Sequence, residues 1–409
     1  TEQGTDGANR YNLLESIREF ARGRLTASGE FEAQRERHAE HFARSAKELQ
    51  SKQRAGDLAE ALRILDADEA EFRSALRFTI DTHRHELAGR IIGGLGYLWY
   101  AAGLFREGTD WCRTLLDDDP LLSEEIRADV LHSYASALSG AGDPETAIDV
   151  LTEQVAIRRR LGDPMRLAGA LTNLGNNLVD VGHIEAARTV LDEAAELFVE
   201  LGESASLALV ECTLAYGEMI EGRYGDAEAT FSEALRHARS ADHAMSTAVS
   251  MSGLGQALTY ADRGADARPH LVESHERFVE LSVPPGVITA DTMLGLVARN
   301  SGDPVTAARH WRSALDGPGQ SWFEQDDYSI LQYVASIIDD LLTAATLVGA
   351  ASAAYEKSQV RQIAYVLDDL AATRSRLEAQ LDPDEFGPRF RAGERRTKAE
   401  AMAIGTAAL

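Results

Sequence analysis

Cysteine, proline and aromatic residues are scarce in this 409-residue sequence. The two cysteines, Cys112 and Cys212, are too few and too far apart for a disulfide framework, so we expect reduced, buried thiols of a cytoplasmic protein. Only 10 residues are proline and 7% are aromatic, whereas alanine, leucine, glutamate and arginine abound. Such a composition favours helices over sheets, and it predicts an all-α protein.

Long apolar runs and a secretory signal are also missing. No run approaches the roughly 18 apolar residues of a membrane-spanning helix, and no signal peptide is visible. The formal charge of −25 means that the surface repels phosphate backbones. The one basic cluster, RFRAGERRTK at 389–398, is short and contains Glu394, which favours a solvated surface. We therefore expect this fragment to bind neither a membrane nor, by itself, nucleic acid.

A repeat with a step of 40 residues occupies the middle of the chain. Apolar residues recur every three or four positions within each unit, which predicts a first helix A and a second helix B, both amphipathic. One such pair cannot bury its apolar face alone, so the units should stack into a solenoid. Three columns keep the 40-residue step without an insertion: small residues (Ala135, Gly175, Ala215, Gly255 and Gly295), alanines (Ala147, Ala187, Ala227, Ala267 and Ala307) and bulky residues (Leu151, Leu191, Phe231, Leu271 and Trp311).

These columns resemble the tetratricopeptide repeat, whose motif has the same spacing of twelve and then four residues. We expect the small and alanine columns to let helices A and B approach closely, and the bulky column to fill the gap to the next unit. The unit is longer than the motif's usual 34 residues, so its helices should be longer too. The resemblance implies an all-α fold, a right-handed superhelical solenoid of helix-pair repeats of about 40 residues.

The repeat fades at both ends, which divides the chain into five parts. Residues 1–9 are expected to be a tail left from a preceding domain, and residues 10–85 a helical linker or capping region. Residues 86–316 should form the repeat array. Helix pairs are expected over residues 317–381, followed by a linker and a terminal helix over residues 382–409.

The two ends carry a second resemblance. The block RYNLLESIREFARGRL at 10–25 is similar to a recurrent block of large bacterial regulators, the signal-transduction ATPases with numerous domains. These include LuxR-type and antibiotic-pathway transcription activators of actinomycetes. The segments LWYAAGLFREGTDWCRTLL (98–116) and EFGPRFRAGERRTKAEAMAIGTAAL (385–409) also have counterparts there. One departure is Glu71-Phe72, where relatives usually show Asn-Leu. The apolar positions of the first block should cap the solenoid's first helices: Leu13, Leu14, Ile17, Phe20 and Leu25.

This second resemblance implies a non-catalytic sensor and protein-interaction region of a transcription regulator. Its arm would hold the ATPase domain inactive, or receive a partner protein, a peptide or a small inducer. ATP and magnesium would bind only in a missing upstream domain, since this chain has no G-x-x-x-x-G-K-[ST] loop and no helix-turn-helix pattern. Two alternatives stay open: a stand-alone peptide-binding receptor of helical-repeat type, and an accessory arm of a nucleotide-cyclase or other ATPase fusion.

No pattern predicts catalysis, a cofactor or a metal. GGLGYLW (93–99) lies inside a helical unit, where glycines favour close helix packing over a nucleotide loop. His83 and His85 flank a helix end, but two histidines do not close a zinc site. The DDD run at 117–119 lacks the glycine and distal glutamate of a calcium loop. There is no G-x-S-x-G nucleophile elbow either, so we predict no enzyme activity.

The concave groove of the solenoid is the candidate binding site. Helix A should line it, with the positions three before, one after and four after the small column facing inward. These positions are mostly small, neutral and hydrogen-bonding, which favours a contact surface. The other interpretation is that short polar side chains merely permit tight curvature. A single arginine there argues against a clamp for a peptide carboxylate. The candidate contacts are His132, Ser136, Thr172, Asn176, Cys212, Tyr216, Met219, Ser252, Gln256, Thr292 and Arg299.

Overall fold

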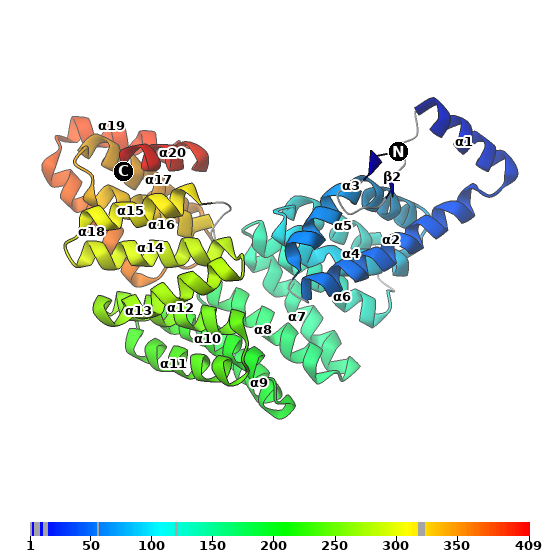
Figure 1. Ribbon diagram of the computed structural model, residues 1–409, viewed down its shortest axis with the longest axis horizontal. Helices are drawn as coiled ribbons and strands as arrows, with labels where there is room; N and C mark the ends of the chain where they lie inside the picture. Colours follow the sequence, from blue (N-terminus) through cyan, green and yellow to red (C-terminus); the bar gives the residue numbers. More distant parts are fainter. Residues whose placement is uncertain (1, 4–8, 11–14, 55–56, 119–121, 318–323) are drawn as a thin grey trace. The chain divides into compact units, whose positions relative to one another are not determined.

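The computed structural model describes the whole chain except residues 1, 4–8, 11–14, 55–56, 119–121 and 318–323. Its regular elements are helices, apart from a short antiparallel pair formed by β1 (Glu2–Gln3) and β2 (Asn9–Arg10) (Figure 1). The all-α helical-repeat prediction is confirmed. Among the described helices, none combines the length and the apolar character of a membrane span. The chain divides into two compact units, Thr1–Ala141 and Gly142–Leu409.

The first unit packs its helices around a core to which the helices of Trp99 and Trp111 both contribute. Trp99 is buried, and the ring of Phe42 meets that of Phe72 edge-on at 4.9 Å. Cys112 is a buried free thiol, as expected. The helices of this unit are α1 (Glu15–Ser28), α2 (Phe31–Arg54), α3 (Leu58–Asp81), α4 (His85–Ala101), α5 (Phe105–Asp118) and α6 (Glu124–Gly140).

The second unit contains most of the repeat. Its A helices are α8 (Pro164–Asp180), α10 (Ser204–Ile220), α12 (Ala244–Tyr260), α14 (Pro284–Asn300) and α16 (Glu324–Ile337). Its B helices are α7 (Pro144–Leu161), α9 (Ile184–Leu201), α11 (Tyr224–Ser240), α13 (Gly264–Glu280), α15 (Pro304–Asp316) and α17 (Leu341–Lys357). The A helices each begin 40 residues after the previous one, and α16 keeps this step beyond the DGPGQSW break at 316–322.

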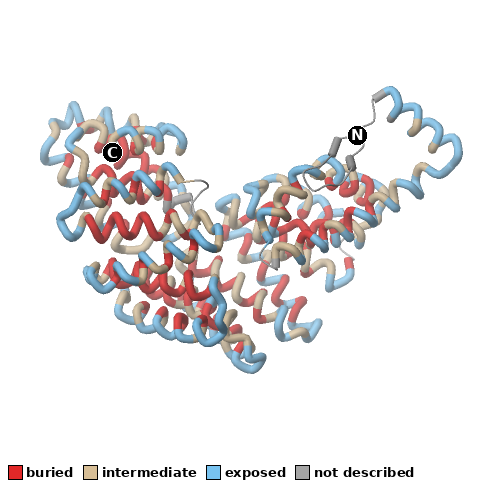
Figure 2. The backbone as a smooth tube through the Cα atoms, viewed as in Figure 1, coloured by how far each residue is buried: buried red, intermediate tan, exposed pale blue. Residues whose placement is uncertain are grey.

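The bulky side chain of each of two repeats packs directly against the small residue of the same repeat. A Cβ atom on Gly175 would lie 2.4 Å from the side chain of Leu191, and one on Gly295 would lie 2.2 Å from the Trp311 indole. The bulky side chain therefore sits on its own A helix. It also reaches the next A helix, as the sequence predicted: a Cβ on Gly253 of α12 would lie 2.1 Å from Phe231, and the Trp311 ring stacks on Tyr333 of α16 at 5.8 Å. Figure 2 shows the consequence, since the A helices α12 and α14 are buried along most of their length.

The turns from helix A to helix B explain a second column of glycines. Gly142, Gly182, Gly222 and Gly302 all have φ between 74° and 82°, a left-handed backbone that glycine adopts without a steric cost. In the fourth of these turns the glycine is replaced by Asp262, which has φ of 59°; the sequence there is Asp262-Arg263-Gly264. Aspartate is among the residues that tolerate this conformation, so the turn survives the exchange.

Two expectations about the chain ends are corrected. The segment after Asp382 was expected to be a linker, but residues Pro383–Glu394 form α19, between α18 (Ala364–Gln380) and the terminal helix α20 (Lys398–Ala408). Proline at the first position suits a helix start, so Asp382-Pro383 begins a helix rather than ending one.

In the opening block, Ile17 is 48% and Phe20 is 70% exposed, so they do not cap the first helices. Leu13 and Leu14, like most of the expected 1–9 tail, lie outside the described residues.

Helices α17 and α19 cross closely at two glycines. A Cβ atom on Gly393 would lie 2.0 Å from the Thr346 carbonyl oxygen, and one on Gly349 would lie 2.1 Å from the Phe390 carbonyl oxygen. Backbone atoms cannot rotate away as a flexible side chain can. The crossing therefore depends on the absence of side chains at both positions.

Gly393→Ala should destabilise the protein by about 1–3 kcal/mol, because the added methyl group forces the two helices apart. The matched control is Gly169→Ala in α8, where a Cβ would meet nothing within 4 Å. This control should stabilise by about 0.5–1 kcal/mol through helix propensity alone. Urea denaturation followed by circular dichroism measures both. Equal effects of the two substitutions would contradict the close crossing.

Candidate functional site

Most of the candidate contact positions lie on the A helices of the second unit. Successive A helices α8, α10, α12 and α14 contact one another as well as their own B helices. They therefore form a continuous layer in which side chains at related positions of neighbouring repeats lie side by side. This arrangement decides which of the sequence-predicted residues stay accessible and which become packing.

Two polar contacts join consecutive A helices. The Thr213 hydroxyl of α10 donates to Oδ1 of Asn176 on α8 at 2.7 Å. Nε2 of Gln256 on α12 donates to the Tyr216 hydroxyl on α10 at 3.3 Å. We call these four side chains the polar ladder. Gln256 is only 6% exposed, but Asn176 and Tyr216 are half-buried and keep surface that a ligand can reach.

Thr172 stands beside this ladder on α8. It is half-buried, and its hydroxyl donates to the Ala168 carbonyl of its own helix at 2.8 Å. The Tyr216 ring packs edge-on against Phe231 at 5.3 Å, which anchors its apolar part and leaves the hydroxyl for polar contacts. Three of the predicted contacts, Thr172, Asn176 and Tyr216, are thus partly accessible on adjacent repeats.

Four other predicted contacts are buried between helices. Cys212, Met219, Ser252 and Thr292 are at most 4% exposed. These side chains are taken up by contacts within the array, because successive A helices approach one another at this level. They offer a partner little surface in this arrangement.

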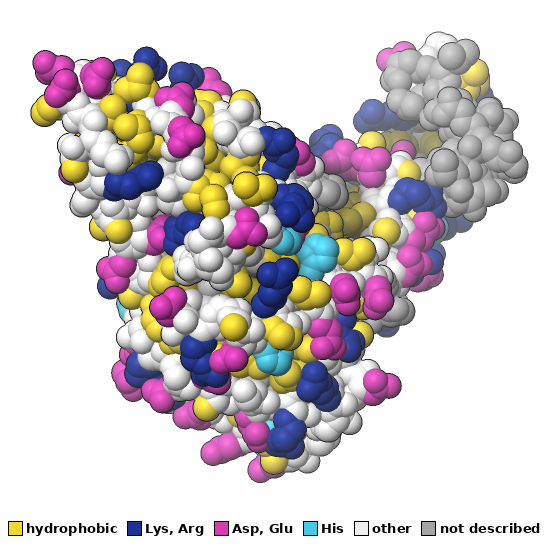
Figure 3. All heavy atoms as spheres, turned by 60° about the vertical axis from the view of Figure 1, so that its left-hand side comes forward, with side chains coloured by type: hydrophobic (Ala, Val, Ile, Leu, Met, Phe, Trp, Pro, Cys, Tyr) yellow, Lys and Arg dark blue, Asp and Glu magenta, His cyan; other side chains and the backbone are white. Residues whose placement is uncertain are grey.

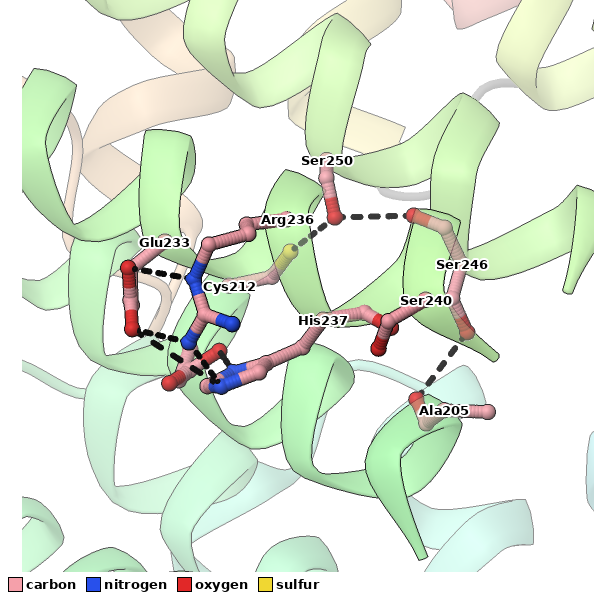
Figure 4. Close-up of polar contacts among 9 residues, drawn as sticks. Ala205, Cys212, Glu233, Arg236, His237, Ser240, Ser246 and Ser250 are labelled. Carbon is pink, nitrogen blue, oxygen red and sulfur yellow. Dashed lines mark hydrogen bonds and ion pairs between the residues drawn. The ribbon is translucent and has the colours of Figure 1, made fainter. Parts of the chain in front are cut away.

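The surroundings of Cys212 illustrate the burial (Figure 4). Its thiol lies 3.4 Å from the Ser250 hydroxyl of α12, which donates in turn to the Ser246 carbonyl at 2.8 Å. The Ser246 hydroxyl donates to the Ala205 carbonyl of α10 at 3.0 Å, so the chain of contacts returns to the helix of Cys212. Burial raises the pKa of the Cys212 thiol to about 12, so this cysteine is not a nucleophile at neutral pH.

Arg299 is occupied by a contact that the sequence did not reveal. Its guanidinium forms an ion pair with Asp369 of α18 at 2.6 Å and lies 5.4 Å from the centre of the Tyr333 ring. Burial opposes the charged form, but the hydrogen bond from Arg299 to Asp369 raises the pKa of the arginine above its ordinary value. The only arginine among the candidate contacts is therefore neutralised within the chain.

The segment that brings Asp369 into place crosses the A-to-B turns of several repeats. We call residues 358–366 the strap. The Arg361 amide donates to the Asp180 carbonyl at the end of α8 at 2.5 Å. The Tyr365 amide donates to the Tyr224 hydroxyl at 3.1 Å, and the Tyr365 ring lies 4.9 Å from that of Tyr260. Arg299 and Asn300 both donate to the Tyr365 hydroxyl, at 3.3 and 3.0 Å.

The Asp180 carboxyl sits where the strap meets α8. Burial raises the pKa of Asp180 from its ordinary 3.8 to about 7. A carboxyl with this pKa is partly neutral near physiological pH, because the folded protein disfavours its charged form. Nothing in the sequence around GNNLVDVG indicated this shift, since it depends on segments that are distant in the chain.

Asp180→Asn should stabilise the protein in a pH-dependent way. A raised folded-state pKa means that wild-type stability is lost as pH rises from about 4 through about 7. The variant escapes this loss, so its Tm advantage over wild type should grow between pH 4 and pH 7 and then level off. Differential scanning fluorimetry across pH measures it. The control Asp192→Asn removes an exposed carboxyl of α9 and should show no such trend; parallel curves for the two variants would refute the assignment.

The remaining two predicted contacts, His132 and Ser136, lie on α6 in the first unit. Both are half-buried, and the Ser136 hydroxyl donates to the His132 carbonyl at 2.9 Å. Their part in binding stays a prediction.

Sequence reasoning also missed two acid–histidine contacts, one buried and one half-buried, whose acids lie four residues before the small column. Asp291 is 4% exposed; its carboxylate accepts from His310 at 2.9 Å and from Ser313 at 2.6 Å, and lies 3.7 Å from His275. Burial opposes ionisation, but these hydrogen bonds hold the pKa of Asp291 well below its usual range. In the earlier repeat, the Glu211 carboxylate lies 2.8 Å from Nδ1 of His237. These pairs tie helix A to helix B inside a repeat and do not form an open site.

On the face shown in Figure 3, acidic and basic side chains are interspersed with apolar ones. Hydrogen-bonding groups of the inner layer, rather than a charged patch, therefore distinguish the candidate site.

Comparison with known sequences agrees with this architecture. Residues 168–193 match the family profile described as tetratricopeptide repeat. A protein of Mycobacterium tuberculosis (strain ATCC 25618 / H37Rv), named as an HTH-type transcriptional regulator, is 25% identical over 224 residues. A similarly named protein of Mycobacterium bovis matches equally. The match covers 53% of this chain but 25% of each relative, so the chain spans about a quarter of the length of these regulators.

Solved structures share the fold at low sequence identity. A Rap protein in complex with competence and sporulation factor is 14% identical, with a TM-score of 0.58 over 90% of this chain and 99% of that chain. The apo form of the quorum sensor NprR from B. thuringiensis is 15% identical, with a TM-score of 0.53 over 86% of this chain and 98% of that chain. Residues 168–193 therefore match one tetratricopeptide repeat, and the chain shares the helical-repeat fold of these solved structures.

Proposed function

We propose that this chain is the non-catalytic sensor and interaction region of an ATP-dependent transcription regulator, and that the accessible part of the polar ladder contacts its effector. The observation that carries the proposal is the ladder itself. Asn176 and Tyr216 present an amide and a phenol at equivalent positions of adjacent repeats, in a chain that is otherwise strongly charged. Such groups recognise hydrogen-bonding partners without requiring a charge on them.

The side chains of the site limit which chemical classes of effector it can bind. Arg299 is paired with Asp369, so no free cation is placed among the described contacts of this layer to hold an anionic group. An extended peptide backbone, with alternating donors and acceptors, suits amide and hydroxyl groups spaced along successive repeats. A polar, uncharged small molecule is the other class that these groups fit.

The relatives support both parts of the proposal. The Mycobacterium proteins that match over half of this chain carry the name of transcriptional regulators and are much longer. The Rap protein of similar fold was solved with competence and sporulation factor, which shows that an array of this architecture can hold a signalling factor. A regulator in which this chain is one region is consistent with both.

Asn176→Ala combined with Tyr216→Phe should weaken peptide binding by about 5- to 150-fold, because two hydrogen bonds of roughly 0.5–1.5 kcal/mol each are removed. The probe is a peptide selected from a random phage-displayed library on the immobilised chain, labelled and titrated by fluorescence anisotropy. Tyr216→Phe keeps the ring on Phe231, so the fold should persist.

The matched control is Thr189→Ala on the exposed face of α9, which should leave the affinity unchanged. Circular dichroism checks that all variants fold alike. Selected peptides that bind the double variant as tightly as the wild type would reject the polar ladder as the site.

The complete gene product separates the regulator from its alternatives. The proposal expects a P-loop ATPase and a DNA-binding domain in the same polypeptide. A cyclase domain would favour the accessory-arm alternative, and a polypeptide consisting of the repeat region alone would favour a stand-alone peptide receptor.

A further inference from the structure

Three potential metal ligands converge in the first unit, whereas the polar ladder belongs to the second unit. His83 lies in the turn between α3 and α4, His85 begins α4, and Asp118 ends α5. Oδ2 of Asp118 lies 2.7 Å from Nε2 of His85 and 3.6 Å from Nδ1 of His83. The three ligand atoms all lie within 4.8 Å of one another. The sequence showed only the two histidines, because Asp118 is distant in the chain and sits in a run that resembled a solvated helix end.

The turn explains how two histidines reach one carboxylate. Residues two apart on a helix do not face each other. His83 instead adopts a left-handed backbone with φ of 53°, which ends α3 and redirects the chain before His85. The two imidazole rings then meet edge-on, with centroids 5.3 Å apart and planes at 87°. This geometry leaves a ring nitrogen of each histidine close to the same carboxylate oxygen.

Exposure is graded across the cluster. The His85 side chain is 10% exposed, that of Asp118 38% and that of His83 75%. One ligand is therefore held firmly by the surrounding protein, while another borders on solvent and leaves a path by which an ion could enter. An ion pair between His85 and Asp118 would not require the His83 imidazole, which also lies near the Asp118 carboxylate.

We propose that His83, His85 and Asp118 bind a divalent transition-metal ion, with zinc as the best match. Two imidazole nitrogens and one carboxylate oxygen are ligands that zinc accepts, whereas calcium and magnesium prefer oxygen alone. Bonds of about 2.0–2.1 Å in a tetrahedral site place ligand atoms roughly 3.3 Å apart. The 3.6 Å pair is close to this value, and the 2.7 Å pair lengthens when the metal replaces the shared proton.

Three protein ligands leave a fourth position for water, so the site is open and exchangeable rather than a closed structural centre. Each imidazole would bind the ion through an unprotonated ring nitrogen. The ion would connect the α3–α4 turn to the end of α5, and it would stabilise the first unit increasingly as the free zinc concentration rises above the Kd.

The test titrates zinc chloride into the untagged protein at pH 7.5 by isothermal calorimetry, with magnesium chloride as a comparison. We expect one zinc site per chain and no magnesium binding. His83→Ala and Asp118→Asn should each weaken zinc binding at least about tenfold, since each removes a ligand. Because His83 is mostly exposed, His83→Ala should fold normally, which thermal unfolding without metal verifies.

Two matched controls remove similar groups outside the cluster. Asp117→Asn changes the neighbouring exposed carboxylate, and His183→Ala removes an exposed histidine of the second unit. Neither should alter the zinc affinity. Cobalt(II) provides an independent readout, since visible absorption bands of a low-symmetry site should appear with wild type and disappear with His83→Ala. Absence of zinc binding up to about 1 mM, or equal losses in ligand and control variants, would overturn the proposal.

Discussion

The contact between a bulky B-helix side chain and a small A-helix residue is the constraint on which the array depends. Trp311 shows it most clearly. Its indole lies on Gly295, where no side chain would fit, and its Nε1 donates to the Thr292 carbonyl at 3.1 Å. Each such contact sets how close the two helices of a repeat lie. The next repeat can then add its A helix to the same layer, so a local packing rule becomes the architecture of the unit.

The same constraint limits the binding surface. Once successive A helices lie in contact, the side chains between them become structural, whatever their polarity. Cys212 and Thr292 are buried for this reason, whereas Asn176 and Tyr216 lie where the layer still has an accessible edge. Polar residues that recur at helical spacing therefore include both buried packing residues and accessible contact residues. How many of them stay accessible depends on the distance between helices, which the repeat motif alone does not specify.

The sequence predicted those features that depend on local periodicity. The 40-residue step anticipated the helix pairs, and small residues at fixed intervals anticipated the close contacts within each pair. It did not predict α19, because an Asp-Pro dipeptide can either interrupt a helix or begin one, and packing against α17 decides. The exposed Ile17 and Phe20 were misjudged for a similar reason, since apolar character does not show whether a partner surface is present.

The strap contacts and the candidate metal ligands, which the sequence did not reveal, involve residues that are distant in sequence. The link between Tyr224 and Tyr365 spans 141 residues, and the convergence of Asp118 with His83 and His85 joins the end of α5 to the α3–α4 turn. Repeats reveal nearest neighbours, because each unit packs on the next by the same rule. They do not reveal where a non-repeating segment packs against the array. The ion pair between Arg299 and Asp369 of α18 therefore could not be predicted from the sequence.

The strap has a mechanical consequence for the second unit. An ordinary solenoid behaves as a chain of nearest neighbours that can flex like a spring and unfold from its ends. Here the strap reaches the end of α8 through Arg361 and the end of α14 through Tyr365, so repeats that do not adjoin are joined by a shared tie. These contacts must break before that edge of the array can extend. The cooperativity of the second unit therefore depends on a segment outside the repeat as well as on contacts between neighbouring repeats.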